Sequence, residues 1–122
     1  MEQRMNKYRL TLITENQKSI DKSKKFAELI CKTLDCKNGY EVSKYEKLDN
    51  SFRIEIIEKL ENGINLIEQS IELTDRICTP WAVTYDRTEN LVELMFNKSD
   101  FSSFRRNELN ALNWARFEIE NE

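Results

Sequence analysis

Residues 52–78, FRIEIIEKLENGINLIEQSIELTDRIC, decide how this chain folds because they are compatible with two secondary structures. Apolar and charged residues alternate over Phe52–Ile56, which predicts a strand. The same apolar residues also approximate a helical period, so Ser51 could instead cap one long helix that reaches Cys78. Gly63 in the interior of such a helix would cost about 1 kcal/mol relative to alanine. We therefore expect a strand, a turn and a separate helix.

This helix is expected to begin at about Lys59 or Asn62 and to end at Pro80. Its sequence carries two stripes of side chains at spacings of three and four residues. The apolar stripe consists of Leu60, Ile64, Ile67, Ile71, Thr74 and Cys78. The acidic stripe, about a quarter turn away at 100° per residue, consists of Glu61, Glu68, Glu72 and Asp75. Because like charges on neighbouring turns cost roughly 0.2–0.5 kcal/mol each, the acidic stripe indicates a surface for a basic partner. The alternative is a solvated helix face.

The N-terminal region predicts a strand and a helix. Residues alternate over Tyr8–Ile13, which is typical of a strand. A helix is expected from about Gln17 to Asp35, with Asn38-Gly39 as its C-terminal stop. The side chains expected on its core side are Phe26, Ala27, Ile30, Cys31 and Leu34.

Two hairpins and a final strand complete the predicted fold. Turn residues separate Tyr40–Tyr45 from Phe52–Ile56, and a polar loop, Asp86–Asn90, separates Trp81–Tyr85 from Leu91–Phe96. Beyond a polar loop at residues 97–104, a helical turn is expected over residues 105–112 and a strand over residues 115–119. The order is β-α-β-β-α-β-β-β. The simplest solution is an α+β fold, with a mixed or antiparallel sheet of about five to six strands and two main helices on one face.

Length and composition predict a single globular domain over residues 1–122. Apolar residues make up 39% of the chain and charged residues 34%. Residues 1–50 carry a charge of +3 and residues 51–122 a charge of −6. The acidic second half argues against nucleic acid as the partner there, because phosphate binding needs lysine and arginine. No apolar run approaches the ~20 residues that span a bilayer, and the polar N-terminus predicts no signal peptide.

The sequence lacks the residues of the common catalytic sites. It contains no histidine and two glycines, so the usual general base, metal ligand and phosphate loop are missing. Asp86, Glu89 and Asn90 cluster in the second hairpin loop but are explained by turn formation, without an EF-hand pattern. We expect no enzyme activity, no cofactor and no metal site. The three cysteines are expected to be buried thiols in a reducing cytoplasm.

Two aromatic residues in the polar loop after the second hairpin are candidate binding anchors. Phe101 and Phe104 are flanked by Asp100, Arg105 and Arg106, and an aromatic side chain among charges is typical of an interface hot spot. The alternative is that both phenylalanines fold back over an edge of the sheet.

Three segments of the later half resemble a known class of proteins. They are WAVTYD at residues 81–86, NLVELMFN at residues 90–97 and NWARFEI at residues 113–119. In pattern they resemble small immunity proteins of bacterial polymorphic toxins, including contact-dependent growth inhibition systems. The resemblance implies a cytoplasmic protein that neutralises a cognate toxin, often a nuclease, by covering its active site.

The sequence therefore predicts an immunity-type inhibitor of a basic toxin domain. The residues expected to bind it are Glu61, Glu68, Glu72, Asp75, Asp86, Glu89, Phe101 and Phe104. An alternative is a phage or mobile-element protein that binds a host defence or regulatory complex. A small enzyme or nucleotide-binding domain is a third reading, and it predicts a deep polar pocket with converging carboxylates.

Overall fold

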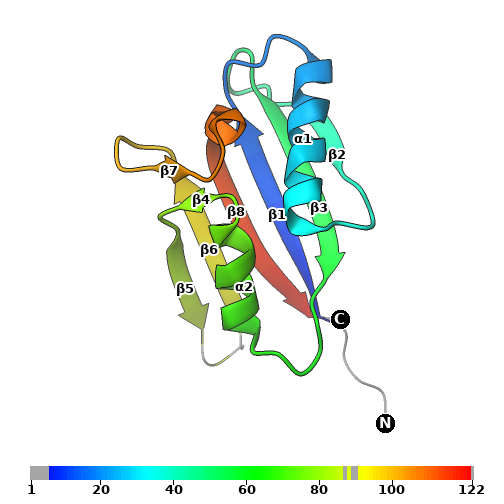
Figure 1. The fold of residues 1–122 in the computed structure, drawn as a ribbon, viewed down its shortest axis with the longest axis vertical. Coiled ribbons are helices and arrows are strands. Elements are labelled where there is room, and N and C mark those ends of the chain that lie inside the picture. The colour runs from blue at the N-terminus through cyan, green and yellow to red at the C-terminus, as the bar shows by residue number, and fades with distance from the viewer. Residues whose placement is uncertain (1–5, 87, 89–90, 122) are drawn as a thin grey trace.

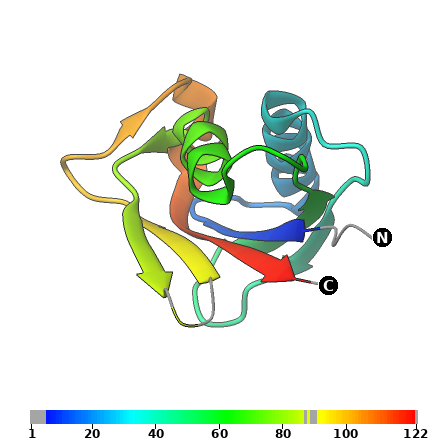
Figure 2. The same ribbon diagram turned by 90° about the horizontal axis from the view of Figure 1, so that it is seen from below.

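The computed structural model describes residues 6–86, 88 and 91–121. Within them, the larger sheet has six strands in the order β2-β3-β1-β8-β6-β5, and all its neighbouring strands are antiparallel. These strands are β1 (Asn6–Thr14), β2 (Glu41–Lys44), β3 (Phe52–Lys59), β5 (Ala82–Asp86), β6 (Leu91–Asn97) and β8 (Leu112–Asn121). Helices α1 (Ile20–Leu34) and α2 (Leu66–Asp75) lie on the same face of this sheet (Figures 1 and 2). The predicted α+β class and element order are confirmed.

The core lies between the sheet and the helices. In β1, Tyr8, Leu10 and Leu12 point to the helix face and are at most 2% exposed. They meet the inward residues of β3 and β8, such as Ile56 and Phe117, which are paired with Leu10 in the sheet register. The alternation read from the sequence therefore becomes one apolar face at the centre of the sheet.

Helix α1 begins and ends inside the predicted range. Ser19 caps it by accepting a hydrogen bond from the Lys22 N–H. Its C-terminus is set by Asp35, which has a φ of 55°, and by the Cys36 N–H, which donates to the Cys31 carbonyl at 2.9 Å. This is the Schellman pattern of bonds. The prediction that Asn38-Gly39 ends the helix is therefore wrong, because a left-handed Asp35 satisfies the last carbonyls earlier in the chain.

Helix α2 is shorter than predicted. The stretch Phe52–Lys59 is a strand, so the long-helix alternative is wrong, and Asn65 caps α2 by accepting hydrogen bonds from the Ile67 and Glu68 N–H groups. The helix ends at Asp75, five residues before Pro80. Residues 60–65 instead form the loop between β3 and α2. In this loop Gly63 has a φ of 84°, a value that glycine adopts without strain.

The predicted apolar stripe on this helix is confirmed at Ile67 and Thr74, which face the core, and is wrong at its other four residues. Leu60 and Cys78 are buried but lie outside α2, while Ile64 and Ile71 are 45% and 47% exposed. The fully buried residues of α2 are Ser70 and Thr74, whose hydroxyls donate to the carbonyls of Leu66 and Ser70 at 2.7 and 2.8 Å, while Leu66, Ile67 and Leu73 are partly buried against the core. A side chain that bonds within its own helix can be buried at low cost, and for this reason hydrophobic periodicity did not detect Ser70.

A small second sheet was not predicted. It pairs β4 (Cys78–Thr79) with β7 (Ser103–Phe104), and a 3-10 helix, η1 (Asn107–Ala111), then leads into β8. The predicted loop at residues 97–104 therefore ends in a strand, whereas the expected helical turn within residues 105–112 is confirmed. Among the described residues, no helix has the length and apolar character to cross a membrane.

Candidate functional site

A groove of about 1010 Å³ lies between the C-terminal end of α1 and helix α2. Its floor is formed by Tyr8 of β1, by Glu58 of β3 and by Leu60, which follows the end of β3. Its walls are formed by Leu34, Asp35, Lys37 and Asn38 on one side and by Ile64, Glu68, Gln69, Glu72, Leu73 and Arg76 on the other. Both helices lie on the same face of the sheet (Figure 2).

The charge of this interhelical groove is negative. It is lined by five acidic residues, Asp35, Glu58, Glu61, Glu68 and Glu72, and by three basic ones, Lys37, Lys59 and Arg76. These charges differ in how far the fold already compensates them. That difference decides which of them are available to a ligand.

Glu58 is committed to the fold. It is 8% exposed, and its two carboxylate oxygens accept hydrogen bonds from the backbone N–H groups of Lys37 and Asn38 at 2.9 and 2.7 Å. The carboxylate therefore fixes the chain that leaves α1 against the end of β3. Sequence analysis missed this residue, although its position supplied a signal. Glu58 shares the inward phase of the alternation with Ile54 and Ile56, where a charged residue needs a buried partner.

Glu72 and Arg76 join the two helices across the groove. The Arg76 Nε donates to the Glu72 Oε1 at 2.7 Å, and its Nη1 donates to the Thr33 carbonyl near the end of α1 at 3.3 Å. Its guanidinium also lies 3.9 Å from the Asp35 carboxylate. A large part of the Glu72 charge is therefore compensated inside the protein.

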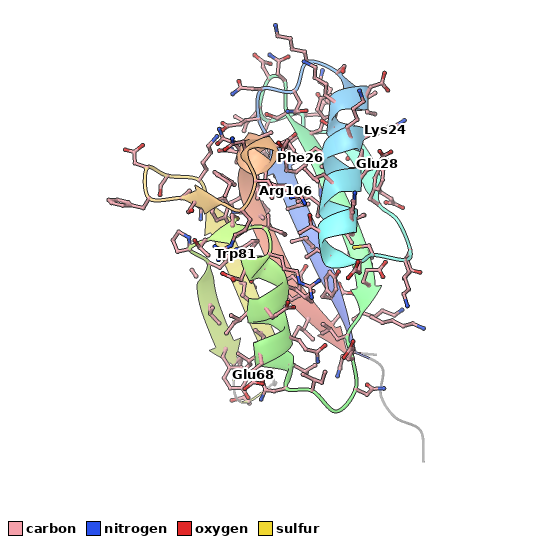
Figure 3. All side chains as sticks on the ribbon, viewed as in Figure 1. Lys24, Phe26, Glu28, Glu68, Trp81 and Arg106 are labelled. Carbon is pink, nitrogen blue, oxygen red and sulfur yellow. The ribbon has the colours of Figure 1, made fainter. Side chains whose placement is uncertain are left out.

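Among the acidic residues of the groove, Glu61 and Glu68 are the two whose carboxylates the fold does not compensate, and the exposed Lys37 and Lys59 line the same groove. Both glutamate side chains are exposed, and within the described part of the chain neither carboxylate takes part in a hydrogen bond or an ion pair. Gln69 positions Glu61, because its amide accepts from the Glu61 N–H at 2.9 Å and donates to the Glu61 carbonyl at 2.9 Å. Glu68 lies in the first turn of α2, at the lower end of that helix (Figure 3).

The other predicted site residues are not gathered at this groove. Glu61 precedes α2, so the expected row of four carboxylates on one helix does not exist. Asp75 is paired with Arg105, whose Nη2 lies 2.6 Å from the Asp75 Oδ1. Asp86 is the last residue of β5, an outer strand of the sheet, and does not line the groove. Its carboxylate accepts a hydrogen bond from the Thr88 N–H. Glu89 lies outside the described residues.

The two candidate aromatic anchors are separated by their environments. Phe104 is partly buried and packs edge-on against Phe96, with 5.7 Å between the ring centroids, so it folds back over the sheet. Phe101 is 88% exposed at the tip of the loop before β7. Of these two anchors, Phe101 is the one that presents an open aromatic surface, and it does not line the groove.

The groove floor also contains Tyr8, which leads to a group of thiols. The Tyr8 hydroxyl lies 3.7 Å from the Cys36 Sγ, and burial raises the pKa of Tyr8 above its usual value. Burial also raises the pKa of Cys31 to about 12 and raises that of Cys36. These thiols therefore stay protonated at neutral pH and are weak nucleophiles.

No metal-ligand cluster of three or more Cys, Asp or Glu side chains is found among the described residues. Comparisons with protein-family models, with curated proteins and with solved structures gave no match. The chemistry of the groove itself is what bears on function. It offers a cationic ligand the open carboxylates of Glu61 and Glu68, with the exposed side chains of Lys37 and Lys59 in the same lining.

Proposed function

We propose that this protein works by binding, as an immunity-type inhibitor in the cytoplasm that neutralises a basic toxin domain by covering its active site. The observation that carries the proposal is the pair of exposed, uncompensated carboxylates of Glu61 and Glu68 at the negatively charged interhelical groove. A nuclease active site is positively charged because it binds phosphate. An acidic protein surface can occupy such a site in place of the nucleic acid.

The groove is lined by fifteen residues, fewer than the roughly 20–30 that each partner contributes to a standard interface. A stable complex buries roughly 1,600 Å² of surface in total, so side chains around the groove must contribute as well. Lys59 and Gln69 line the groove beside Glu61 and Glu68. Electrostatic steering by such a surface raises association rates about 10- to 1,000-fold at low salt.

The resemblance of residues 81–86, 90–97 and 113–119 to immunity proteins supports the same class of function. Most of these residues lie in β5, β6 and β8, which form the sheet under and beside α2 rather than the groove. The resemblance therefore concerns the scaffold. The feature that indicates a binding surface is the charge of the groove.

The test is affinity capture from the native host with three tagged proteins. They are the unmodified chain, a groove variant (Glu61→Lys with Glu68→Lys) and a matched control (Glu46→Lys with Glu108→Lys). The control reverses two acids that are also exposed but do not line the groove. We expect mass spectrometry to find a basic toxin domain with the unmodified chain and the control, and not with the groove variant.

Kinetics with the captured toxin domain then test the mechanism. The groove variant should associate at least about tenfold more slowly at low salt, with a weaker dependence on ionic strength, and should inhibit the toxin less. Equal on-rates for the groove variant and the control would remove Glu61 and Glu68 from the interface. If a host defence or regulatory complex is captured instead of a toxin, the immunity function is wrong. The alternative, a phage or mobile-element inhibitor, would then be supported.

A further inference from the structure

The two outer strands of the six-stranded sheet differ in how they are protected. β2 and β5 are the first and last strands in its order. β2 has four residues, with Glu41 and Lys44 at its ends, and short charged edges of this kind resist pairing with other chains. β5 has five residues, AVTYD, of which Asp86 is the charged one, and all five are exposed.

The helix side of β5 also exposes apolar side chains. Val83 is opposite Leu94 in the sheet register, and Tyr85 is opposite Val92. Leu94 and Val92 are buried on the helix face, so Val83 and Tyr85 point to that same face. They remain 48% and 45% exposed, because α2 covers β6 and β8 but not the outermost strand (Figures 1 and 2).

Helix α2 continues this apolar surface. Ile71, which is 47% exposed, lies five residues before Arg76 and therefore about 140° away around a helix. Arg76 reaches toward α1, so Ile71 is on the flank of α2 away from the groove, on the side of β5. We define Ile71, Val83 and Tyr85, with the strand β5 itself, as the β5 surface.

We propose that the β5 surface is an interface between two copies of this chain, joined by antiparallel pairing of β5 with β5 about a twofold axis. A twofold interface requires one patch that is complementary to itself. In the register centred on Thr84, all five residues of each strand are paired. Val83 is opposite Tyr85 of the second copy, and an aromatic residue facing a β-branched one is a favourable cross-strand pair.

The charge distribution fits this occupant. In the same register Asp86 is opposite Ala82 of the second copy, so no like charges face each other, and Thr84 meets Thr84. The pairing also keeps the apolar side chains of both copies on one face of the sheet, because residues opposite each other in an antiparallel pair point to the same face. Val83, Tyr85 and Ile71 of both copies then gather on the helix side of a continuous sheet.

The predicted dimer is weak. Pairing of two five-residue strands with three apolar side chains per copy buries less than the roughly 1,200 Å² of a small specific interface. Sedimentation velocity from low micromolar to near-millimolar concentration should therefore show a reversible shift from monomer to dimer. The variants Val83→Lys and Thr84→Lys should each abolish that shift, since a lysine on an edge strand opposes pairing.

The matched control is Ser43→Lys, which places the same charge in the middle of the exposed strand β2. It should dimerise like the unmodified chain. Thermal unfolding of all variants checks the fold, and Thr84→Lys serves if Val83→Lys does not fold. A monomer at every concentration, or a dimer that survives both β5 variants, would overturn the proposal.

A cysteine at position 84 tests the register. In the proposed pairing the two Cα atoms of residue 84 lie about 4.5–5.5 Å apart, which a disulfide can bridge. With copper phenanthroline as oxidant, Thr84→Cys should give a covalent dimer, and Ser43→Cys should not exceed the background from the native cysteines. This proposal does not depend on the function of the groove, because it concerns the other flank of α2.

Discussion

The two helices cover the sheet in different ways. α1 has 15 residues and buries Phe26, Ala27, Ile30 and Leu34 against the strands. α2 has 10 residues, buries Ser70 and Thr74 fully and Leu66, Ile67 and Leu73 partly, and leaves Ile71 exposed. Since burial of apolar area is the main favourable term in folding, we expect α1 to contribute more to stability than α2.

The surfaces that we propose for binding lie beside the helix that is less buried. Beside the C-terminal end of α1, the Glu58 carboxylate is held by two backbone N–H groups of the protein itself. The side under α2 exposes the carboxylates of Glu61 and Glu68 on one flank and the apolar β5 surface on the other. Both proposed interfaces therefore border the helix that the core uses least.

The first prediction compares the loss of stability when one isoleucine on each helix is replaced by alanine, and it contains the largest expected effect. Ile30→Ala removes a fully buried side chain and should lower the free energy of unfolding by about 2–5 kcal/mol. Ile71→Ala removes one that is 47% exposed, and should change it by about 0.5 kcal/mol or less. Urea unfolding measures both values. Equal losses would mean that α2 packs as tightly as α1.

The second prediction compares two glutamates of the same groove. Glu58→Gln weakens the hydrogen bonds to the Lys37 and Asn38 N–H groups and should cost about 1–3 kcal/mol. Glu68→Gln changes an exposed carboxylate and should cost less than about 0.5 kcal/mol. The reverse order in chemical unfolding experiments would show that Glu68 has a structural role.

The third prediction concerns the pH dependence of stability near the end of α2. Burial raises the pKa of Cys78 to about 12, whereas a thiol in the unfolded chain has its ordinary value near 9. The unfolded state loses its proton first as pH rises, so the contribution of Cys78 is complete below pH 9 and is lost between pH 9 and 12. At pH 10 the loss is about 1 kcal/mol. Cys78→Ala should flatten the slope of unfolding free energy against pH, and an unchanged slope would contradict this assignment.

The smallest effect is expected at the ion pair that attaches α2 to the small sheet. Arg105 donates to both the carbonyl and the carboxylate of Asp75, at 2.7 and 2.6 Å, but both side chains are about half exposed. Arg105→Ala should therefore cost only about 0.2–1 kcal/mol, measured by thermal unfolding. High salt should reduce the difference from the unmodified chain. A loss as large as that of Ile30→Ala would show that this pair holds α2 in place.

Much of the fold could be predicted where pattern and environment agree. Tyr8, Leu10 and Leu12 alternate and all reach the core. The face of α1 was predicted from the same rule with a period of 3.6. Both hairpins followed from turn residues between alternating segments, and the paired strands are those expected.

The prediction failed where polar residues are buried and apolar ones are exposed. Ser70, which was not predicted to be buried, satisfies its hydroxyl within α2, and the β4–β7 pair joins residues that are far apart in sequence. The candidate site residues were also predicted incorrectly in part, because their pairing depends on contacts between distant segments. Whether an acidic residue is free or paired depends on Arg76 and Arg105 reaching it through space.

The sequence by itself therefore determined the local periodicity, and with it the class of fold, the order of elements and the negative charge of the second half. The tertiary structure alone decided which carboxylates are compensated and which strand lies at an open edge. The physical reason is range. Periodicity is set by neighbours three or four residues apart, whereas charge compensation and edge exposure depend on contacts between segments that only folding brings together.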